Sequence, residues 1–367
     1  MEKKNVAIVH YMFGCGGAEH VVAELAEGID KNRFNVDVVC IYGSKLNNDM
    51  ERRVSESGAM IHYLGHSKCE SALMGVIKVW QCLSRLKPSV VHTHLGAVQY
   101  CLPWAIAHDI KLLHTIHNVP DKEVSGSHFA KLMSFLYRKK IAVPVTISRQ
   151  NQLLTANYYS LPLNYVELIN NPVDTAFFCL PPSSMEIDFD FINVAGLRKQ
   201  KNQRNLLEAF AAVVERRPGA RLAIVGDGSE RDSLVEYADT LDIASKVTFV
   251  GQVNEKLPLR SYLWRSRVFV LSSDYEGLPL AALEAMSCGL PVVSTDVGGM
   301  SDLVSGNGQL VPAADSKALA DAMLYILDNL NCRDDMKTIS REIASDYDSK
   351  ICVGKYERLY ESCIITK

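Results

Sequence analysis

The chain has 367 residues, of which 48% are hydrophobic and 22% are charged, and its formal net charge is −3. An intrinsically disordered chain is excluded, since it would need low hydrophobicity and high net charge. The small net charge gives no reason to expect nucleic-acid binding. At about 150 residues per domain, the length predicts two domains.

The first half of the chain alternates strand-like apolar runs with helical patterns. We predict helices at Ala18–Ile29, Ser71–Leu86 and Ser127–Lys140. The strands between and around them are predicted at Val6–His10, Val36–Ile41, Met60–Tyr63, Val90–His94, Lys111–His117 and Val143–Ser148. This alternation is typical of a parallel sheet covered by helices on both faces.

The alternation restarts in the second half. Its predicted strands are Phe191–Ala195, Arg221–Val225, Val247–Val250, Val268–Leu271 and Pro291–Ser294. Its predicted helices are Gln203–Arg217, Glu230–Leu241, Leu280–Ser287 and Ser316–Asn329. Two runs of similar length predict an α/β protein of two doubly wound domains.

The domain boundary is expected in residues 170–188, a polar, non-periodic stretch with three prolines. Residues 1–171 carry 18 Lys and Arg against 14 Asp and Glu, a balance of +4, and the remainder is at −7. All ten histidines precede residue 130. A basic first domain favours an anionic surface or substrate there, although random surface charge would give the same balance.

Ten cysteines are present, and no two have the spacing of a C-x-x-C zinc or redox motif. The N-terminal apolar run has no signal-peptide pattern, and no stretch approaches the ~20 apolar residues of a membrane span. These features favour a cytoplasmic protein with reduced thiols.

Chemistry-bearing residues follow the predicted strands of the first half. After the first strand comes GCGGAE, Gly14–Glu19, then a helix; this turn could bind a phosphate at the helix N-terminus or be purely structural.

Two later predicted strands end in histidines: His92 and His94 in one, and His114 and His117 in the other. Zinc is disfavoured, because no carboxylate or cysteine lies beside them at ligand spacing. One or two are expected to be structural, and the others to be hydrogen-bond donors in a cleft.

Cations gather after the first strand of the second half, at Arg198, Lys199, Lys201 and Arg204. Cations beside a helix N-terminus favour an anion site, although a solvated lysine-rich loop is the alternative. Gly226, Asp227 and Gly228 then precede another helix and predict close backbone approach.

Two glutamates, Glu276 and Glu284, flank the start of the helix in EGLPLAALEAMSCGLP. Glu276 is expected just before the helix N-terminus, and Glu284 about one turn inside. A carboxylate on an otherwise apolar helix face needs hydrogen-bond partners. The paired hydroxyls of a sugar or ribose would supply them.

With these residues in place, the chain resembles the family 4 retaining glycosyltransferases of GT-B architecture. The segment Glu276–Glu284 is similar to their E-x(7)-E signature. GGAEH, VHTH, HTIHN, VTISR, NNPVD, LRKQKN, IVGDGSE and VTFVGQV are similar to further family segments, in the same order. The resemblance covers nearly the whole chain and implies two Rossmann-like domains with a cleft between them.

The resemblance also implies residue roles. Glu276 and His117 would be catalytic, facing the transferred sugar near its reaction centre. Donor binding would involve Glu284 at the ribose, Lys201 and Arg198 at the diphosphate, and Gly16, Gly17, Gly226, Gly277 and Leu278 in loops and amides around it. The family's phosphate arginine is replaced here by Gly196, so Arg198 is expected to substitute for it.

The domains implied are 1–171, an acceptor-side domain, and 172–346, a nucleotide-sugar domain. Residues 347–367 resemble a terminal helix that crosses back to the first domain. With this helix included, the balance of formal charge becomes +5 for the first domain and −8 for the second.

The expected activity is transfer of a sugar from a nucleotide diphosphate sugar, with UDP-sugars favoured, to a saccharide or lipid-linked saccharide hydroxyl. The resemblance implies retention of the anomeric configuration, no metal and no cofactor. Two alternatives remain: a GT-B sugar epimerase, and an inactive nucleotide-sugar-binding scaffold subunit. Lys201 is expected to be exposed, so that its loss would weaken donor binding without unfolding the protein.

The helix at Ser127–Lys140 places Lys131, Arg138, Lys139 and Lys140 beside five apolar side chains: Phe129, Leu132, Met133, Phe135 and Leu136. This pattern is typical of a helix on an anionic bilayer. It is equally typical of a domain helix packed on a sheet. Peripheral membrane contact on the inner face is therefore a further expectation.

Overall fold

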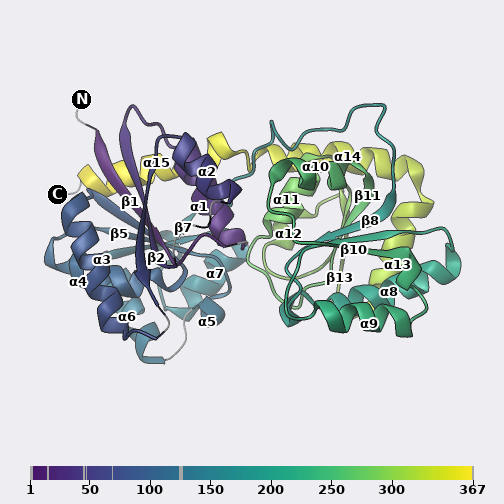
Figure 1. Cartoon of the computed structure of the whole chain (residues 1–367), viewed down its shortest axis with the longest axis horizontal. Coiled ribbons are helices and arrows are strands. Elements are labelled where there is room, and N and C mark those ends of the chain that lie inside the picture. The colour runs from purple at the N-terminus through teal and green to yellow at the C-terminus, as the bar shows by residue number, and fades with distance from the viewer. Residues whose placement is uncertain are drawn as a thin grey trace. The chain divides into compact units, whose positions relative to one another are not determined.

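The computed structural model describes residues 3–14, 16–43, 46, 48–67, 69–123 and 127–365. The chain divides into two compact units (Figure 1). The N-terminal unit comprises Met1–Pro172 and Ser349–Lys367, and the C-terminal unit comprises Val173–Asp348. Each unit is an α/β domain built on one parallel sheet.

The N-terminal unit has a seven-stranded sheet of order β3-β2-β1-β4-β5-β6-β7. All the neighbouring strands pair in parallel. From β1 the chain moves outward to β3 and then returns to β4, so the strand order reverses between β1 and β4. The strands are β1 Lys4–His10, β2 Phe34–Tyr42, β3 Met60–His66, β4 Val90–His94, β5 Leu112–Ile116, β6 Ala142–Thr146 and β7 Glu167–Leu168.

Helices cover both faces of this sheet. One face packs on α3, α4 and α6, whose buried side chains join those of the strands in a single core. Local capping defines where helices begin: the Ser71 side chain accepts the Met74 N–H at α3, and Ser148 accepts the Asn151 N–H at α7. The helices are α1 Gly17–Gly28, α2 Asp49–Glu56, α3 Ala72–Leu86, α4 Val98–Ala107, α5 Pro120–Glu123, α6 Ser127–Arg138, α7 Arg149–Tyr158 and α15 Ser349–Ile365.

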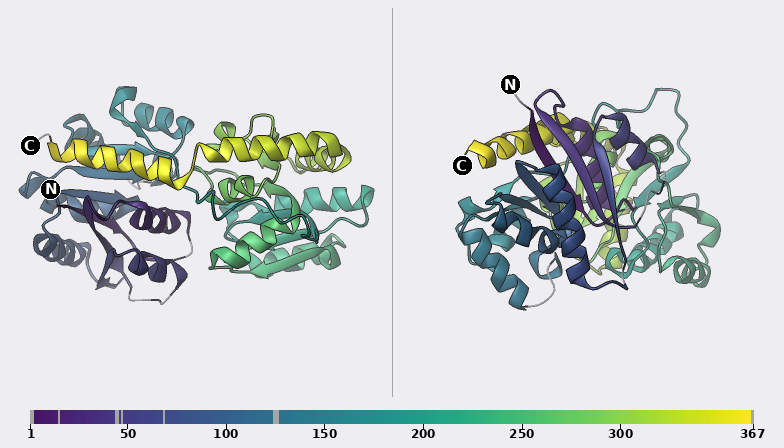
Figure 2. Two further views of the ribbon diagram at one scale, coloured as in Figure 1. Left: turned by 90° about the horizontal axis from the view of Figure 1, so that it is seen from above. Right: turned by 60° about the vertical axis from the view of Figure 1, so that its left-hand side comes forward.

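The final helix, α15, is part of the N-terminal unit and packs on α1 and β4 (Figure 2). Its Tyr356 and Tyr360 are fully buried. The Tyr360 hydroxyl lies 2.8 Å from Nδ1 of His92, and the Tyr356 hydroxyl lies 3.1 Å from Oγ1 of Thr115. The two tyrosine rings are buried and their hydroxyl groups have hydrogen-bond partners. These contacts hold α15 against the centre of the sheet.

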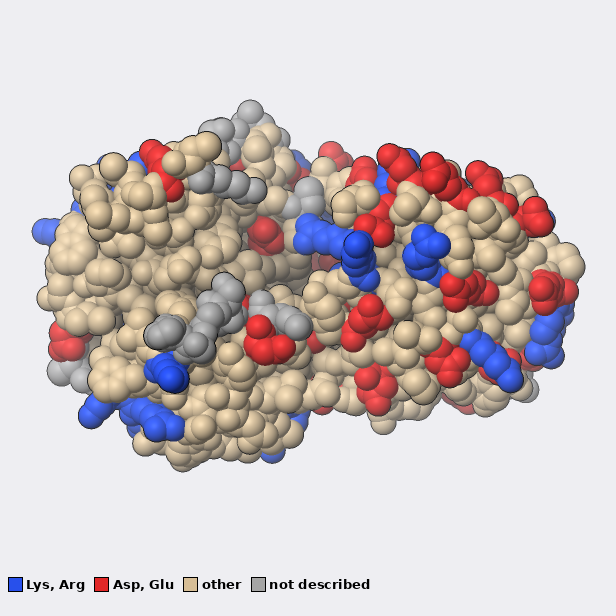
Figure 3. Space-filling view, turned by 90° about the horizontal axis from the view of Figure 1, so that it is seen from below, with Lys and Arg blue, Asp and Glu red and all other residues tan. Residues whose placement is uncertain are grey.

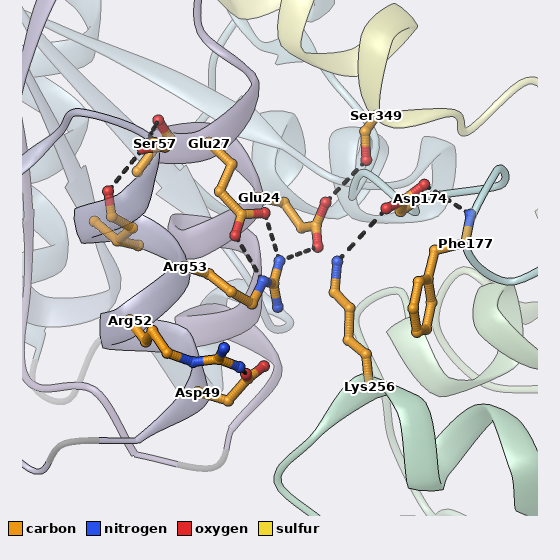
Figure 4. Close-up of polar contacts among 12 residues, drawn as sticks. Glu24, Glu27, Asp49, Arg52, Arg53, Ser57, Asp174, Phe177, Lys256 and Ser349 are labelled. Atoms are coloured by element: carbon orange, nitrogen blue, oxygen red, sulfur yellow. Dashed lines mark hydrogen bonds and ion pairs between the residues drawn. The ribbon is translucent and has the colours of Figure 1, made fainter.

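A partly buried ion network connects α1, α2 and the start of α15 (Figure 4). Arg53 of α2 donates to Glu27 at 2.6 Å and to Glu24 at 2.7 Å, both on α1. The other oxygen of Glu24 accepts the Ser349 hydroxyl at 3.0 Å. One arginine thus lies between two carboxylates that would otherwise repel each other in a poorly solvated site.

The C-terminal unit has a six-stranded parallel sheet of order β10-β9-β8-β11-β12-β13. The order reverses between β8 and β11. The strands are β8 Phe189–Val194, β9 Leu222–Val225, β10 Val247–Gly251, β11 Ser266–Leu271, β12 Val292–Thr295 and β13 Gly308–Val311. The helices are α8 Gln203–Arg216, α9 Arg231–Thr240, α10 Lys256–Trp264, α11 Leu280–Ser287, α12 Met300–Leu303, α13 Ser316–Asp328 and α14 Leu330–Ser345.

The structure confirms two Rossmann-like domains and each predicted strand, within a few residues at the ends. Two edge strands, β7 and β13, were not predicted, because they have two and four residues and no apolar run. The helices α2, α4, α5, α7, α10, α12 and α14 were also missed. Within the described residues, no helix combines the length and apolar character needed to cross a bilayer.

Candidate functional site

Both units place their candidate residues where ligands bind in open α/β sheets. Such sites lie outside the carboxyl ends of the strands, at the point where strand order reverses. In the C-terminal unit this point lies between β8 and β11, which lead to Lys201 and Glu276 respectively. In the N-terminal unit it lies between β1 and β4, which lead to the Gly14–Gly17 loop and to His94.

Lys201 and Glu276 form an ion pair in the C-terminal unit. The lysine Nζ donates to Oε1 of Glu276 at 2.6 Å and to Oε2 at 2.8 Å. The Ser273 hydroxyl donates to the same Oε1 at 2.6 Å. Glu276 is only 5% exposed, so its negative charge depends on these donors.

The loops that carry this pair are fastened to each other by further bonds. Asp274 donates its N–H to the Gln200 carbonyl, and the Gln200 side-chain amide donates to the Tyr275 carbonyl, both at 2.9 Å. The Ser272 hydroxyl donates to the Lys201 carbonyl at 2.9 Å. Hydrogen bonds between the two loops therefore position Lys201 and Glu276, in addition to the attraction between their charges.

Arg198 lies exposed at the start of the same loop. A Cβ built on Gly196 would lie 3.7 Å from Nε of Arg198. The Arg198 side chain therefore runs beside the point from which a side chain at position 196 would start. This placement is compatible with substitution for the arginine that the family has there.

Gly226 is explained by backbone packing. Its φ is 138°, and a Cβ there would lie 2.0 Å from the Ala195 carbonyl oxygen. A Cβ on Gly228 would lie 2.2 Å from the Leu197 carbonyl oxygen. The two glycines let the loop after β9 pack on the loop that begins the Lys201 segment, so they shape the site by close approach of two backbones.

Glu284 is the fifth residue of α11, and Glu276 precedes that helix by four residues, as predicted. Glu284 is half-buried beside buried Ala282, Leu283 and Ala285. In the described part of the chain, the Gly277 N–H donates no hydrogen bond, whereas its carbonyl accepts the Gly299 N–H at 2.6 Å. The Gly277 N–H is therefore available to an acceptor in the segment between β11 and α11.

The N-terminal unit begins α1 at Gly17, with Gly16 as its N-cap residue. The Glu19 carboxylate folds back over this loop, because a Cβ on Gly16 would lie 2.4 Å from its Oε2. The helix N-terminus therefore already faces a negative charge from its own first turn, as its dipole favours. A larger residue at position 16 would displace the flexible end of the Glu19 side chain from this position.

The predicted histidine cluster separates into two histidines that are bonded on both ring nitrogens and a second pair that bond each other. His92 bonds Tyr360 and Thr115, and His114 donates from Nε2 to the Leu95 carbonyl at 3.0 Å and accepts the Tyr137 hydroxyl. These two are structural. His94 and His117, from the ends of adjacent strands, lie with Nδ1 and Nε2 2.8 Å apart.

These histidines are neutral, because burial lowers the pKa of His92 and His117 to about 3 and that of His114 to about 4. Burial also raises the pKa of the Glu123 carboxyl to about 7, against the opposing effect of the N–H groups of His117 and Asn118. The described residues contain no group of three or more His, Cys, Asp or Glu that could hold a metal ion.

Two contributors were missed from the sequence. Ser273 lies three residues before Glu276 and bonds it, and the SSDYE segment offers a hydroxyl at that spacing as its only signal. Glu123 accepts the N–H groups of His117 at 3.4 Å and Asn118 at 3.1 Å. Its position on the short helix α5 gave no sequence pattern to find it.

Comparison with known proteins identifies the family. The model for Glycosyltransferase Family 4 matches residues 15–177, and the model for glycosyl transferases group 1 matches residues 184–343. N-acetyl-α-D-glucosaminyl L-malate synthase of Bacillus anthracis is 30% identical in an alignment of 300 positions that covers 77% of this chain and 77% of that protein. The chain belongs to the family 4 GT-B glycosyltransferases.

Two further relatives of this glycosyltransferase align along nearly its whole length. An Escherichia coli UDP-Gal:α-D-GlcNAc-diphosphoundecaprenol α-1,3-galactosyltransferase is 23% identical and is matched over 100% of this chain and 98% of its own. The crystal structure of Anabaena HepE in complex with UDP superposes with a TM-score of 0.81 at 18% identity, covering 98% of this chain and 100% of that one. The second match shows the shared GT-B fold.

Proposed function

We propose that this glycosyltransferase moves a sugar from a UDP-sugar to a hydroxyl of a saccharide or lipid-linked saccharide, with retention and without a metal. The observation that carries the proposal is the Lys201–Glu276 pair at the strand-order reversal of the C-terminal unit. It places a cation and a carboxylate together where a ligand of an open α/β sheet binds.

The chemistry needed is stabilisation of a departing diphosphate. Lys201 and Arg198 would meet its charge, with the Gly277 N–H and the N-terminus of α11 as fixed dipoles. Such preorganised groups are the largest source of catalysis in many enzymes. Glu276 would face the sugar, where positive charge develops, and Glu284 would hold the ribose. Gly16, Gly17 and Leu278 would contribute backbone to the donor site, and Gly226 would shape it.

The relatives support the choice of ligand. HepE was crystallised with UDP, and the Escherichia coli relative is named for a UDP-sugar donor and a diphosphoundecaprenol acceptor. We infer from them a UDP-sugar donor and a lipid-linked or saccharide acceptor for this chain.

The proposal predicts donor binding and turnover in excess EDTA. A UDP-sugar at 100 times its Kd should add about 2.7 kcal/mol of stability in a thermal-shift assay, and GDP-sugars at the same concentration should add less. With acceptor present, the enzyme should release UDP, and the product should keep the donor's anomeric configuration by NMR.

The alternatives have distinct outcomes in the same assay. Stabilisation without UDP release would indicate a scaffold subunit, and conversion of the donor to its epimer would indicate an epimerase. Activity lost in EDTA and restored by Mn²⁺ would contradict metal independence.

A lipid-linked acceptor would bring the N-terminal unit to a membrane, and α6 is the element suited to that contact. The helix buries Met133, Leu136 and Tyr137 in the core, so the alternative of a sheet-packed helix accounts for these three. Leu132 and Phe135 remain 45% and 54% exposed. These two side chains form the outward apolar face.

The charged residues of the sequence around this apolar face are all Lys or Arg. Residues 124–166 contain Lys131, Arg138, Lys139, Lys140 and Arg149 and no Asp or Glu. Figure 3 views the underside of the N-terminal unit, where α6 lies in Figure 1, and shows several Lys and Arg groups at its lower edge, with separate Asp and Glu groups elsewhere on this face. Exposed apolar residues flanked by cations suit an anionic bilayer, each cation near the surface adding about 1 kcal/mol.

The enzyme should therefore co-sediment with phosphatidylglycerol vesicles at low salt and be released at high salt. The variant Lys131→Ser/Leu132→Ser/Phe135→Ser should lose most of the bound fraction, because it removes the apolar face and one cation. A matched control, Leu257→Ser/Lys317→Ser, removes an exposed leucine and lysine of the C-terminal unit and should bind normally. Equal pelleting of both variants would favour a soluble acceptor.

A further inference from the structure

His94 has one bonded and one unbonded ring nitrogen, and it is completely buried. Its Nδ1 lies 2.8 Å from Nε2 of His117, whereas its Nε2 is buried with no hydrogen-bond partner. His117 differs, since it keeps 8% of its surface exposed. Among the described residues, its Nδ1 is neither bonded nor one of the fully buried unpaired atoms.

Both rings are neutral, so each carries one N–H. Burial lowers the pKa of His117 to about 3. Burial, and then the neighbouring histidines, hold the pKa of His94 well below its ordinary value. A 2.8 Å contact between two neutral imidazole nitrogens requires one N–H donor and one bare acceptor.

Two arrangements satisfy that requirement. If His117 donates from Nε2, His94 accepts at Nδ1 and must carry its own proton on Nε2, where a buried N–H has no acceptor. If His94 donates from Nδ1, its buried Nε2 is only a bare lone pair. Orphaned buried N–H groups are rarer in proteins than acceptors with unused lone pairs, so the second arrangement is favoured.

The neighbouring His114 shows how strictly such contacts decide a tautomer. Its Nε2 lies 3.0 Å from the Leu95 carbonyl oxygen, which can only accept, so His114 carries its proton on Nε2. Its Nδ1 then accepts from the Tyr137 hydroxyl. His94 differs from His114, because no carbonyl oxygen lies within hydrogen-bond distance of its Nε2. Its proton is therefore favoured on Nδ1, where it can be donated to His117.

We propose that His94 is a positioning residue that holds His117 in its Nδ1–H tautomer and thereby directs the one N–H of that ring to its accessible side. Resting on the proposed function, this N–H is the hydrogen-bond donor to an oxygen of the transferred sugar. The main chain at His117 is anchored separately, through the Glu123 carboxylate. His94 therefore determines the tautomer of the His117 ring, and Glu123 holds the main chain of His117 in place.

Long-range ¹H–¹⁵N NMR of the histidine-labelled full chain reads the tautomer directly, with His117 assigned by its loss in His117→Gln. His117 should show a protonated Nδ1 and a bare Nε2. In His94→Phe the donor is lost, and the face of the phenyl ring can only accept an N–H, weakly. The signal should therefore shift toward the Nε2–H form. In His94→Asn, whose amide N–H₂ can lie at the Nδ1 position, the Nδ1–H form should be retained.

The same variants are assayed for sugar transfer. His94→Phe should lower kcat/KM about tenfold, the effect of one hydrogen bond, and His94→Asn should recover most of it. His114→Phe removes an equally buried imidazole from β5 and serves as the NMR control, with the tautomer of His117 unchanged.

A His117 that carries its proton on Nε2 in the wild-type chain, or that keeps its Nδ1–H form in His94→Phe, would overturn the proposal. A tautomer that switches as expected with no change in kcat/KM would uphold the positioning by His94 and overturn the role of His117 at the sugar. These outcomes separate the inference from the proposed function.

Discussion

Replacing Lys201 by alanine should lower kcat/KM for the nucleotide-sugar donor by about 10² to 10³, as expected when a preorganised charge at a leaving group is removed. It should also destabilise the C-terminal unit. The sequence alone favoured an exposed lysine with no effect on stability, and that prediction was wrong about exposure. The Lys201 side chain is 21% exposed and is paired with a buried carboxylate, which the alanine variant leaves with Ser273 alone.

We expect the loss of stability to be about 2 kcal/mol, because an uncompensated buried charge costs more than an exposed pair contributes. The melting temperature should fall by roughly 5 °C. Lys317→Ala, which removes an exposed lysine of α13, is the control and should change neither stability nor kinetics.

A double variant tests the origin of the stability loss. Lys201→Ala/Glu276→Gln removes both charges, so its melting temperature should recover toward that of the wild type. Its turnover stays low in either case, because Glu276 is also changed. A melting temperature that stayed as low as that of Lys201→Ala would show that the unpaired Glu276 charge is not what destabilises the single variant. Unchanged kcat/KM in Lys201→Ala would remove its assignment to the donor phosphates.

The two glutamates should differ in kinetic signature. Glu276→Gln should lower kcat about 100-fold with a smaller change in donor KM, because a carboxylate facing the reaction centre acts mainly in the transition state. The amide keeps the size of the side chain and an oxygen for the Ser273 hydroxyl. The loss would therefore reflect charge.

Glu284→Gln should instead raise donor KM about tenfold at nearly constant kcat, because the ribose is held equally in the ground and transition states. Initial rates over a range of UDP-sugar concentrations measure both effects. The same signature from both variants would contradict the division of roles.

The strand and helix periods of the sequence were enough to predict two parallel-sheet domains. Alternating apolar runs and amphipathic stretches are local patterns, and parallel pairing follows from strands joined through helices. Glycines and charged residues after strand ends also marked Lys201, Glu276 and His117 as candidates, because carboxyl ends of parallel strands converge. Strands without an apolar run, β7 and β13, were missed, since pairing with a neighbour, and not their own pattern, makes them extended.

The tertiary structure alone decided the partners of these residues. Lys201 and Glu276 are 75 residues apart, and only the adjacency of β8 and β11 brings them within 2.6 Å. Likewise, no sequence pattern distinguishes His92, bonded on both sides, from His94, left with a buried bare nitrogen. Periodicity reports which face of an element is buried, whereas a hydrogen-bond partner depends on the register and packing of elements distant in sequence.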